Sequence, residues 1–450
     1  MKNKKGSLIT ELNEDEINDY IIKNLAIKTH EKDKFGEVFT PPNLIKEMLD
    51  KLPESVWKDK DYKWLDPANG IGNFPMIVYF KLMKELDSVP LNKRSDHIIK
   101  NMLYMVELNP KNVAISCEIF GKDANIFCDS FLTKDNKSVN PRINDEFGVE
   151  KFDIIMGNPP FQKEKKEGSG NKGGRDLYPY FITKGFDVLK PNGYMVLITP
   201  RKWRAPDKKG EIKATSDILM NKQILYLKIL DKKYTSQVFN GISALVDYFV
   251  VQNVNVTKNT TVVDEMGIET SSMIKNLPFI PNYNLENIQK ILTDKDNGIN
   301  IIYNRSDYGN DKAHVKNKKS VTYKHPIRHS EHKDGSIKNF WTNDDTKINK
   351  ETGYKYFGTR KVILTKNVWP YPYNDYKGNY GMSNYSFGIP IKSKKEDDAK
   401  KEGDEIVRAI ESDNFRKIIS ATKWSSGYTE QNMFKYFKKD FYKHPMFKEK

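Results

Sequence analysis

The sequence predicts an α/β protein: a doubly wound sheet with an antiparallel edge hairpin, followed by a mixed α+β domain. From residue 35 to about residue 253, short apolar runs alternate with amphipathic runs, as strands and covering helices do in such sheets. Three successive apolar runs end in an acidic residue, at the sheet edge where doubly wound folds bind ligands. Beyond residue 257 the composition shifts to Asn, Lys, Tyr and Gly in short irregular runs, which indicates a second domain.

The expected elements follow in chain order. Residues 1–34 are polar with one short amphipathic run and predict a helical lead-in. Residues 35–257 predict the sheet domain, and residues 258–450 the second domain. No helix is expected between residues 234 and 243, so the last two strands are expected to form the edge hairpin. Strands are expected at 62–65, 102–107, 125–128, 152–156, 194–199, 225–230 and 244–252, with helices at 74–86 and 177–189 among them.

Composition indicates which class of partner the protein binds and in which cellular compartment it is found. Lys and Arg number 75 against 60 Asp and Glu, and a net charge of +15 favours nucleic acid over an acidic membrane surface. Two cysteines, Cys117 and Cys128, are too few for a four-thiolate zinc site or a disulfide framework, and no metal is expected. The start lacks a signal-peptide core, and no stretch approaches the ~18 apolar residues of a membrane span. We therefore expect a soluble intracellular protein, in the cytoplasm of a bacterium or of a virus's host, with no membrane partner.

The segment YKWLDPANGIGNF (62–74) predicts a ligand-binding turn. A strand ends in Asp66, and Gly70 and Gly72 allow a tight turn and close approach of a ligand before the next helix. The charge of Asp66 suits a cationic or amine-bearing ligand better than a pyrophosphate. The third glycine of the dinucleotide fingerprint is missing, and a plain strand–turn–helix joint is the alternative interpretation.

Two later acids extend this ligand site. Glu107 ends the apolar run MLYMVE, where a carboxylate can accept hydrogen bonds from ribose hydroxyls. Asp129 ends the run NIFCD, where it can accept a hydrogen bond from an adenine amine. Singly, each is equally an exposed acid at a strand end. Together with Asp66 they outline a nucleoside-bearing ligand laid across the sheet.

The segment FGEVFTPPNLIKEMLDKL (35–52) predicts an amphipathic helix. Thr40 is expected to cap this helix, which Pro41 and Pro42 begin. An ordinary capped helix explains most of the segment, but it explains the Phe39–Thr40 pair less well.

The segment KFDIIMGNPPFQ (151–162) predicts the reacting centre. A buried strand leads into two prolines, which fix φ and lack N–H donors, so the carbonyls there are available as acceptors. Asn158 adds a side-chain carbonyl and Phe161 a flat apolar face, and this combination can hold a planar amide or an aromatic amine. A structural Pro-Pro turn after a strand is the alternative.

The chemistry expected here requires no strong base. An aromatic amine is a weak nucleophile because its lone pair is delocalised into the ring. Hydrogen bonds from its two N–H groups to Asn158 and the Pro159 carbonyl would favour a pyramidal nitrogen, whose lone pair points at an electrophile. The alkylated amine is more acidic and loses its proton readily, in keeping with the lack of a convincing His or Cys nucleophile.

In order, FTPP, DPANGIG, the strand-end Glu107 and Asp129, and NPPF resemble the motif series of S-adenosylmethionine-dependent amino-methyltransferases. Their arrangement over residues 35–253 is similar to the gamma-class, TaqI-like DNA adenine methyltransferases, with a Rossmann-like methyltransferase sheet. The resemblance implies S-adenosyl-L-methionine as cofactor, with Glu107 on its ribose and Asp129 on its adenine. It implies cofactor contacts from Phe39, and a methionine end lined by Thr40, Asp66, Ala68, Gly70 and Gly72.

The same resemblance implies the residues around the target amine. These are Asn158, Pro159, Pro160 and Phe161, together with Phe239 in VFNGISALVDYFVV (238–251), at the position of an aromatic that helps to stack the target base. Two departures from the family pattern are Asn69, where many members have a small residue or Cys, and Ser130, where some have an aromatic. Phe131 is the candidate to replace that aromatic.

The expected substrate is an adenine in duplex DNA, which must be flipped out before its N6 amine reaches such a pocket. Residues 162–176 are glycine-rich and basic, and predict either a loop that closes on phosphate or a disordered surface loop. Arg201, Lys202 and Arg204 are expected to be phosphate contacts or solvated charges. In the second domain, the predicted target-recognition domain, candidate DNA contacts lie at 325–332, 358–369 and 424–428.

Alternative functions remain at this point. RNA adenine methylation uses the same clamp, as does methylation of a protein glutamine amide, although the latter needs no large basic second domain. A non-catalytic DNA-specificity protein is a third alternative, which the intact NPPF disfavours. The sequence leaves open a cognate restriction endonuclease as a partner, and the oligomeric state.

Overall fold

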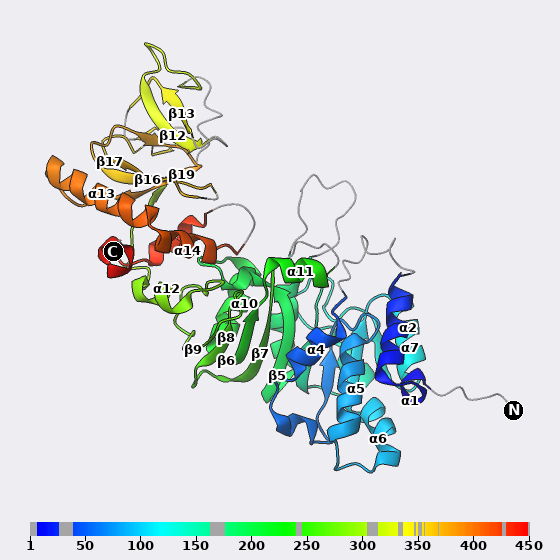
Figure 1. Cartoon of the computed structure of the whole chain (residues 1–450). Helices are drawn as coiled ribbons and strands as arrows, with labels where there is room; N and C mark the ends of the chain where they lie inside the picture. The colour runs from blue at the N-terminus through cyan, green and yellow to red at the C-terminus, as the bar shows by residue number, and fades with distance from the viewer. Residues whose placement is uncertain are drawn as a thin grey trace. The chain divides into compact units, whose positions relative to one another are not determined.

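The chain comprises two compact units (Figure 1). The first is Met1–Trp203 with Lys208–Leu277, and the second is Arg204–Asp207 with Pro278–Lys450. The first unit therefore continues twenty residues beyond the boundary predicted at residue 257. The computed structural model describes residues 7–26, 39–162, 176–239, 245–303, 314–331, 336–345, 348–349, 353–354, 356–367, 369–424 and 429–448.

The first unit contains a nine-stranded sheet of order β3-β2-β1-β4-β5-β7-β6-β8-β9. The strands β3, β2, β1, β4 and β5 run parallel, and the strand order reverses beside β1, which pairs with β2 on one side and β4 on the other. This arrangement confirms the predicted doubly wound α/β fold. The strands are β1 (Trp64–Asp66), β2 (Leu103–Glu107), β3 (Asn125–Cys128), β4 (Phe152–Gly157), β5 (Leu189–Pro200), β6 (Lys222–Ile229), β7 (Val246–Asn255), β8 (Thr260–Val263) and β9 (Glu269–Ser272).

The antiparallel pairing of the predicted hairpin is confirmed. The connection between its two strands and its position in the sheet differ from the prediction. Strand β7 is antiparallel to both β5 and β6. A short helix, α11 (Lys232–Val238), joins β6 to β7 where no helix was predicted, because the Asp231 carboxylate caps it by accepting from the backbone N–H groups of Lys233 and Tyr234. Strands β8 and β9 then extend the sheet beyond β6, so β9 is the edge strand.

Helices cover both faces of this sheet, as its doubly wound pattern requires. One core joins inward side chains of α1, α2, α4 and α5 to alternate residues of the strands, among them Ile17, Met48, Ile77 and Trp64. In its described part, residues 7–26, the predicted lead-in forms the helices α1 and α2, which pack against α7 and α5. The helices are α1 (Leu8–Glu11), α2 (Glu14–Ala26), α4 (Pro42–Leu49), α5 (Asn73–Glu85), α6 (Leu91–His97), α7 (Pro110–Phe120), α8 (Arg142–Phe147), α9 (Tyr178–Val188) and α10 (Gly210–Asn221), with short turns at Glu54–Trp57, Ile98–Met102 and Arg201–Arg204.

The second unit is mixed α+β, as predicted. One sheet has the order β10 (Ile302–Tyr303), β19 (Ser386–Pro390), β16 (Lys361–Thr365) and β17 (Tyr373–Asp375). Another has the order β11 (Val315–Lys316), β13 (Ile337–Thr342), β12 (His325–Glu331) and β18 (Gly381–Met382), and β14 (Ile348–Asn349) pairs with β15 (Gly353–Tyr354). Its helices are α12 (Leu285–Ile291), α13 (Glu396–Glu411) and α14 (Asp413–Ala421), with 3-10 turns at Gln431–Tyr436, Phe441–Lys443 and Pro445–Phe447.

Aromatic packing builds the main core of this second unit. The ring of Phe415 on α14 lies 5.7–6.1 Å from the rings of Phe434, Phe437, Phe441 and Phe447, measured between centroids. These rings come from the irregular C-terminal segment, so burial of aromatic area fixes a part of the chain with little regular structure.

Candidate active site

A cavity opens at the carboxyl ends of β1, β2 and β4, where the strand order reverses. Doubly wound sheets bind ligands at this point because the loops diverge to opposite faces. Eleven of the thirteen residues predicted for the site line the cavity: Phe39, Thr40, Asp66, Ala68, Gly70, Glu107, Asp129, Asn158, Pro159, Pro160 and Phe161.

Asp66 ends β1 and is buried, with 1% of its surface exposed. Its Oδ1 accepts a hydrogen bond from the Ala68 backbone N–H at 3.0 Å. The pKa of Asp66 is raised to about 8, mainly by burial; the Ala68 N–H opposes this rise and the nearby Glu107 carboxylate adds to it. The carboxyl is therefore mostly uncharged at neutral pH, and a cation entering the cavity would favour its ionised form.

Gly157 brings β4 directly against Asp66. Its φ of +147° is a conformation that L side chains rarely adopt, and a Cβ atom there would lie 2.7 Å from Asp66 Oδ1. Because Asn158 follows immediately, this close approach sets the NPPF segment beside the carboxyl end of β1. The glycine stands in the predicted segment KFDIIMGNPPFQ, so its position before Asn158 is a sequence signal that could have been used.

Glu107 at the end of β2 holds the glycine turn. One carboxylate oxygen, Oε2, accepts from the Gly70 backbone N–H at 2.7 Å, and Oε1 accepts from the Asn109 backbone N–H at 2.7 Å. The acid predicted to bind a ribose therefore also ties the turn after β1 to the start of α7.

Asp129 follows β3 and is paired in this structure. Its Oδ2 accepts from the Arg142 guanidinium at 2.7 Å, and its Oδ1 accepts from the Ser130 backbone N–H at 2.7 Å. The Arg142 guanidinium carbon also lies 5.4 Å from the centre of the Phe127 ring. Arg142 was not predicted to belong to the site.

Thr40 and Asn158 meet across the cavity. Asn158 Nδ2 donates to Thr40 Oγ1 at 3.1 Å. The prediction that Thr40 caps the following helix is wrong, because α4 begins one residue later with Pro41 at the N-cap position and no side-chain cap bond. The Thr40 hydroxyl is instead engaged with the NPPF segment.

Two phenylalanines complete the apolar part of the cavity. Phe131 and Phe181 stack with ring centroids 5.5 Å apart and planes 26° apart, and both line the cavity. Phe131 is the residue suggested by the sequence as an aromatic replacement, whereas Phe181 was missed. Phe181 lies on α9, where its spacing is that of an ordinary core residue, so no local signal sets it apart.

Two predicted residues do not line the cavity. Gly72 has φ +98°, and a Cβ atom there would lie 2.6 Å from the Phe120 ring, so it serves the packing of α5 against α7. Phe239, at the C-cap of α11, is 3% exposed within the core, and its predicted contact with a target base stays a prediction. Residues 240–244, and residues 163–175 of the predicted phosphate loop, lie outside the described residues.

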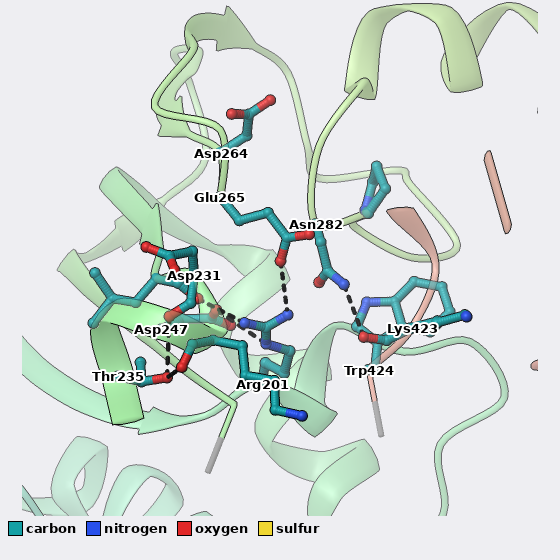
Figure 2. Close-up of polar contacts among 12 residues, drawn as sticks. Arg201, Asp231, Thr235, Asp247, Asp264, Glu265, Asn282, Lys423 and Trp424 are labelled. Carbon is teal, nitrogen blue, oxygen red and sulfur yellow. Dashed lines mark hydrogen bonds and ion pairs between the residues drawn. The ribbon is translucent and has the colours of Figure 1, made fainter. Parts of the chain in front are cut away.

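The predicted phosphate contacts Arg201 and Arg204 are both buried, with 1% of each residue exposed. Arg201 donates to the Glu265 carboxylate at 3.2 Å (Figure 2). It also donates to the Leu230 carbonyl at 2.7 Å. Arg204 donates to backbone carbonyls of residues 280 and 281 and to the side chain of residue 282. The prediction is therefore wrong for these two arginines, whose charges are satisfied inside the protein. Lys202 is half-exposed and pairs with Asp176 at 2.9 Å.

Several candidate DNA contacts of the second unit are also core residues. Arg328 and His329 on β12 are buried, and the Trp424 indole N–H donates to the Ile280 carbonyl at 2.8 Å. All five residues of β16, in the candidate range 358–369, are buried. Residues 332 and 425–428 lie outside the described residues.

An exposed segment of the second unit that was not predicted from the sequence is rich in lysine. Residues 315–324, called here the basic segment, contain four exposed lysines, and no acid occurs from residue 314 to residue 330. Lys319 Nζ lies 5.2 Å from the Trp341 ring centre and Lys316 Nζ 5.6 Å from the Tyr323 ring centre. The exposed lysines are Lys316, Lys318, Lys319 and Lys324.

Two other features, a metal site and a membrane-spanning helix, are not found among the described residues. Among the described residues, no group of three or more His, Cys, Asp or Glu is placed to hold a metal ion. In the same part of the chain, no helix has both the length and the apolar character needed to cross a membrane.

Comparison with known proteins places these features in a family context. Residues 84–239 match the family of Eco57I restriction-modification methylases. An uncharacterized adenine-specific methylase of Mycoplasma pneumoniae is 26% identical over 299 residues, which are 51% of this chain and 70% of that protein. These matches confirm the predicted resemblance to adenine-specific, restriction-modification DNA methyltransferases.

One solved structure shares the fold, and a second shows a weaker similarity. A nuclease-deletion mutant of the Type ISP restriction-modification enzyme LlaGI, in complex with a DNA substrate mimic, aligns with a TM-score of 0.51 at 11% identity, over 84% of this chain and 44% of that chain. A modification subunit of a putative type I restriction enzyme from Vibrio vulnificus YJ016 aligns with a TM-score of 0.42 at 11% identity, over 74% of this chain and 65% of that chain. This chain thus spans less than two thirds of either solved chain.

Proposed function

We propose that this chain, which resembles restriction-modification methylases, transfers the methyl group of S-adenosyl-L-methionine to the N6 amine of an adenine flipped out of duplex DNA. One observation carries the proposal: Asn158 and the prolines after it line the same cavity as Asp66 and Glu107, at the reversal point of the sheet. A methyl donor and an acceptor amine held there would be neighbours.

The residues present suit the cofactor. Because burial raises the pKa of the Asp66 carboxyl, its ionised form is unfavourable at neutral pH. A nearby cation, such as a sulfonium or ammonium group, would stabilise that ionised form. Glu107 and Asp129 supply acceptors for ribose hydroxyls and an adenine amine, and the stacked Phe131 and Phe181 supply apolar surface. When bound, S-adenosyl-L-methionine supplies an electrophilic methyl group.

The chain's own residues would orient the target amine toward the methyl group. The Asn158 side-chain carbonyl and the Pro159 backbone carbonyl would accept the two N–H groups of the target amine, while the Phe161 ring lies against the base. Accepting both protons favours a pyramidal nitrogen with its lone pair directed at the methyl group. Because the methylated amine is acidic, its proton can leave to solvent, and no side chain needs to act as a strong base.

The basic segment supports a nucleic acid as the substrate. Its four lysines are exposed to solvent and no acid occurs within residues 314–330, so the segment as a whole presents positive charge that can attract phosphates. Two of them lie over aromatic rings, which limits their motion without neutralising them. We propose that residues 278–450 form the target-recognition unit and that the basic segment contacts the DNA backbone. A restriction endonuclease acting on the same site is the proposed functional counterpart.

Methyl transfer from radiolabelled S-adenosyl-L-methionine tests the proposal. Wild-type protein should label duplex DNA at adenine N6, and Asn158→Ala and Phe161→Ala should each reduce labelling at least a hundredfold while the cofactor still binds. Structured RNA and a glutamine-containing protein serve as parallel substrates. A wild-type protein that binds the cofactor but labels only RNA or only protein would overturn the DNA assignment.

The DNA contact has its own test. Lys318→Ala and Lys324→Ala should each weaken DNA binding uniformly across sequences and reduce the slope of log affinity against log salt by about one. Lys58→Ala is the matched control, because Lys58 is an exposed lysine of the first unit that pairs with Glu54. If all three variants keep the wild-type salt slope, the basic segment does not contact phosphates.

A further inference from the structure

Thr40 has a contact that its expected place beside the cofactor does not explain. Its side chain is 2% exposed, and its Oγ1 accepts a hydrogen bond from Asn158 Nδ2 at 3.1 Å, across 118 positions of sequence. The hydroxyl does not cap α4, whose N-cap is Pro41. The hydroxyl of FTPP is thus committed to the first residue of NPPF.

An asparagine amide has two orientations that differ by exchange of its oxygen and nitrogen. The orientation decides whether a neighbouring amine meets an acceptor or a competing donor. With Nδ2 directed to Thr40, Oδ1 takes the other position of the amide. We propose that Thr40 is a positioning residue: by accepting a hydrogen bond from Nδ2, it holds Asn158 in the orientation that presents Oδ1 to the target amine.

The local backbone makes Thr40 suited to this task. A residue before proline is restricted to extended conformations, and two consecutive prolines follow Thr40. The β-branched side chain further limits χ1. The Oγ1 atom is therefore held in one place before substrate arrives. The inference rests on the proposed function, since it assigns a role in holding the acceptor amine.

Two kinds of measurement separate this role from cofactor binding. Thr40→Val removes the hydroxyl at nearly constant shape, and Thr40→Ser keeps the hydroxyl. We expect Thr40→Val to lower kcat for methyl transfer about tenfold, equal to about 1.4 kcal/mol, and to change the Kd for S-adenosyl-L-methionine less than twofold. Thr40→Ser should recover most of the lost kcat.

A second measurement observes the side-chain amide of Asn158 directly and does not require methyl transfer. The Asn158 side-chain amide signal in a ¹H–¹⁵N spectrum, assigned by its loss in Asn158→Ala, should shift in Thr40→Val and stay near its wild-type position in Thr40→Ser. Thr199→Val is the matched control, because Thr199 Oγ1 is buried on β5 with no hydrogen-bond partner among the described residues. It should leave this signal unchanged.

The outcomes distinguish the two roles of Thr40. A Thr40→Val variant with weaker cofactor binding and unchanged kcat would assign Thr40 to the cofactor alone and overturn the inference. So would additive losses in kcat when Thr40→Val is combined with Asn158→Ala, since a residue acting through Asn158 has nothing to position once that side chain is gone. If Thr40→Val does not fold, Thr40→Ala replaces it in each measurement. A wild-type protein that transfers no methyl group to DNA while the amide signal responds as expected would refute the proposed function and leave the Thr40–Asn158 coupling intact.

Discussion

Replacing Asp66 with asparagine should make the first unit more stable, and increasingly so as the pH rises. Burial raises the pKa of Asp66 from its ordinary value of 3.8 to about 8. Between these two values the folded protein keeps a proton that the unfolded chain has released. The wild-type free energy of unfolding therefore falls as pH rises, by up to about 1.36 kcal/mol per pH unit from this group. The amide introduced by Asp66→Asn does not titrate, so the variant avoids that loss.

The size of the effect follows from the two pKa values. Integrated from pH 5 to pH 7, the wild type should lose about 2 to 3 kcal/mol relative to Asp66→Asn. Urea unfolding, followed by hydrogen-exchange labelling of peptides from β1 and β4, measures the first unit separately from the second. Asp123→Asn is the charge-matched control, since the Asp123 side chain is 80% exposed. A difference between the wild type and Asp66→Asn that stays constant from pH 5 to pH 7 would refute the uncharged, buried state of Asp66.

Three further outcomes are expected. Cofactor binding to the wild type at pH 7 should release a proton from Asp66, and Asp66→Asn should abolish that release; calorimetry in buffers of different ionisation enthalpy measures it. Gly157→Ala should destabilise the first unit by about 2 to 5 kcal/mol, from backbone strain plus the clash with Asp66, whereas Gly148→Ala, with φ +61° and no atom within 4 Å, should cost only about 1 to 2 kcal/mol in the same unfolding assay. Glu107→Gln loses one of the acceptors for the Gly70 and Asn109 N–H groups, and should cost about 1 to 3 kcal/mol of stability and weaken cofactor binding in a titration.

Local patterns in the sequence were sufficient for strands β1 to β7 and for most of the site. The strand at 125–128 has the predicted bounds, because a short apolar run between turn residues has few alternatives. Acids at strand ends could be assigned to one sheet edge because parallel strands of a doubly wound sheet share their carboxyl ends. Eleven site residues were found in this way and by the family resemblance.

Features that depend on distant partners could not be predicted. Thr40 was expected to cap a helix because Thr before Pro-Pro is a common start, yet its hydroxyl contacts Asn158, a residue that no local rule connects to it. Arg142 reaches Asp129 because α8 packs beside β3, and Phe181 lines the cavity because α9 packs beside β5. Residues 260–263 were assigned to the second domain because the composition changes after residue 257, although they form strand β8, which pairs in parallel with β6.

The prediction of phosphate contacts at Arg201 and Arg204 was wrong for a physical reason. An arginine has five N–H donors, which buried carbonyls and carboxylates can satisfy, so Arg201 and Arg204 are held in the interior. A lysine concentrates its charge on one strongly hydrated group and stays at the surface unless it is paired. The exposed lysines of the basic segment are thus better candidates for phosphate contacts than the arginines of TPRKWR, although both segments are basic.

In the proposed function, the adjacency of β1 and β4 brings the residues that would bind the cofactor close to those that would hold the target amine. These strands are distant in sequence but adjacent in the sheet, with Leu65 beside Ile155. Neighbouring strands lie about 4.8 Å apart, so Asp66 at the end of one and Asn158 just after the other are forced close together, and Gly157 removes the side chain that would separate them. A substitution that adds even one methyl group at Gly157 would therefore disturb the cofactor end and the amine end together, whereas changes at Asp129 would reach only the adenine end.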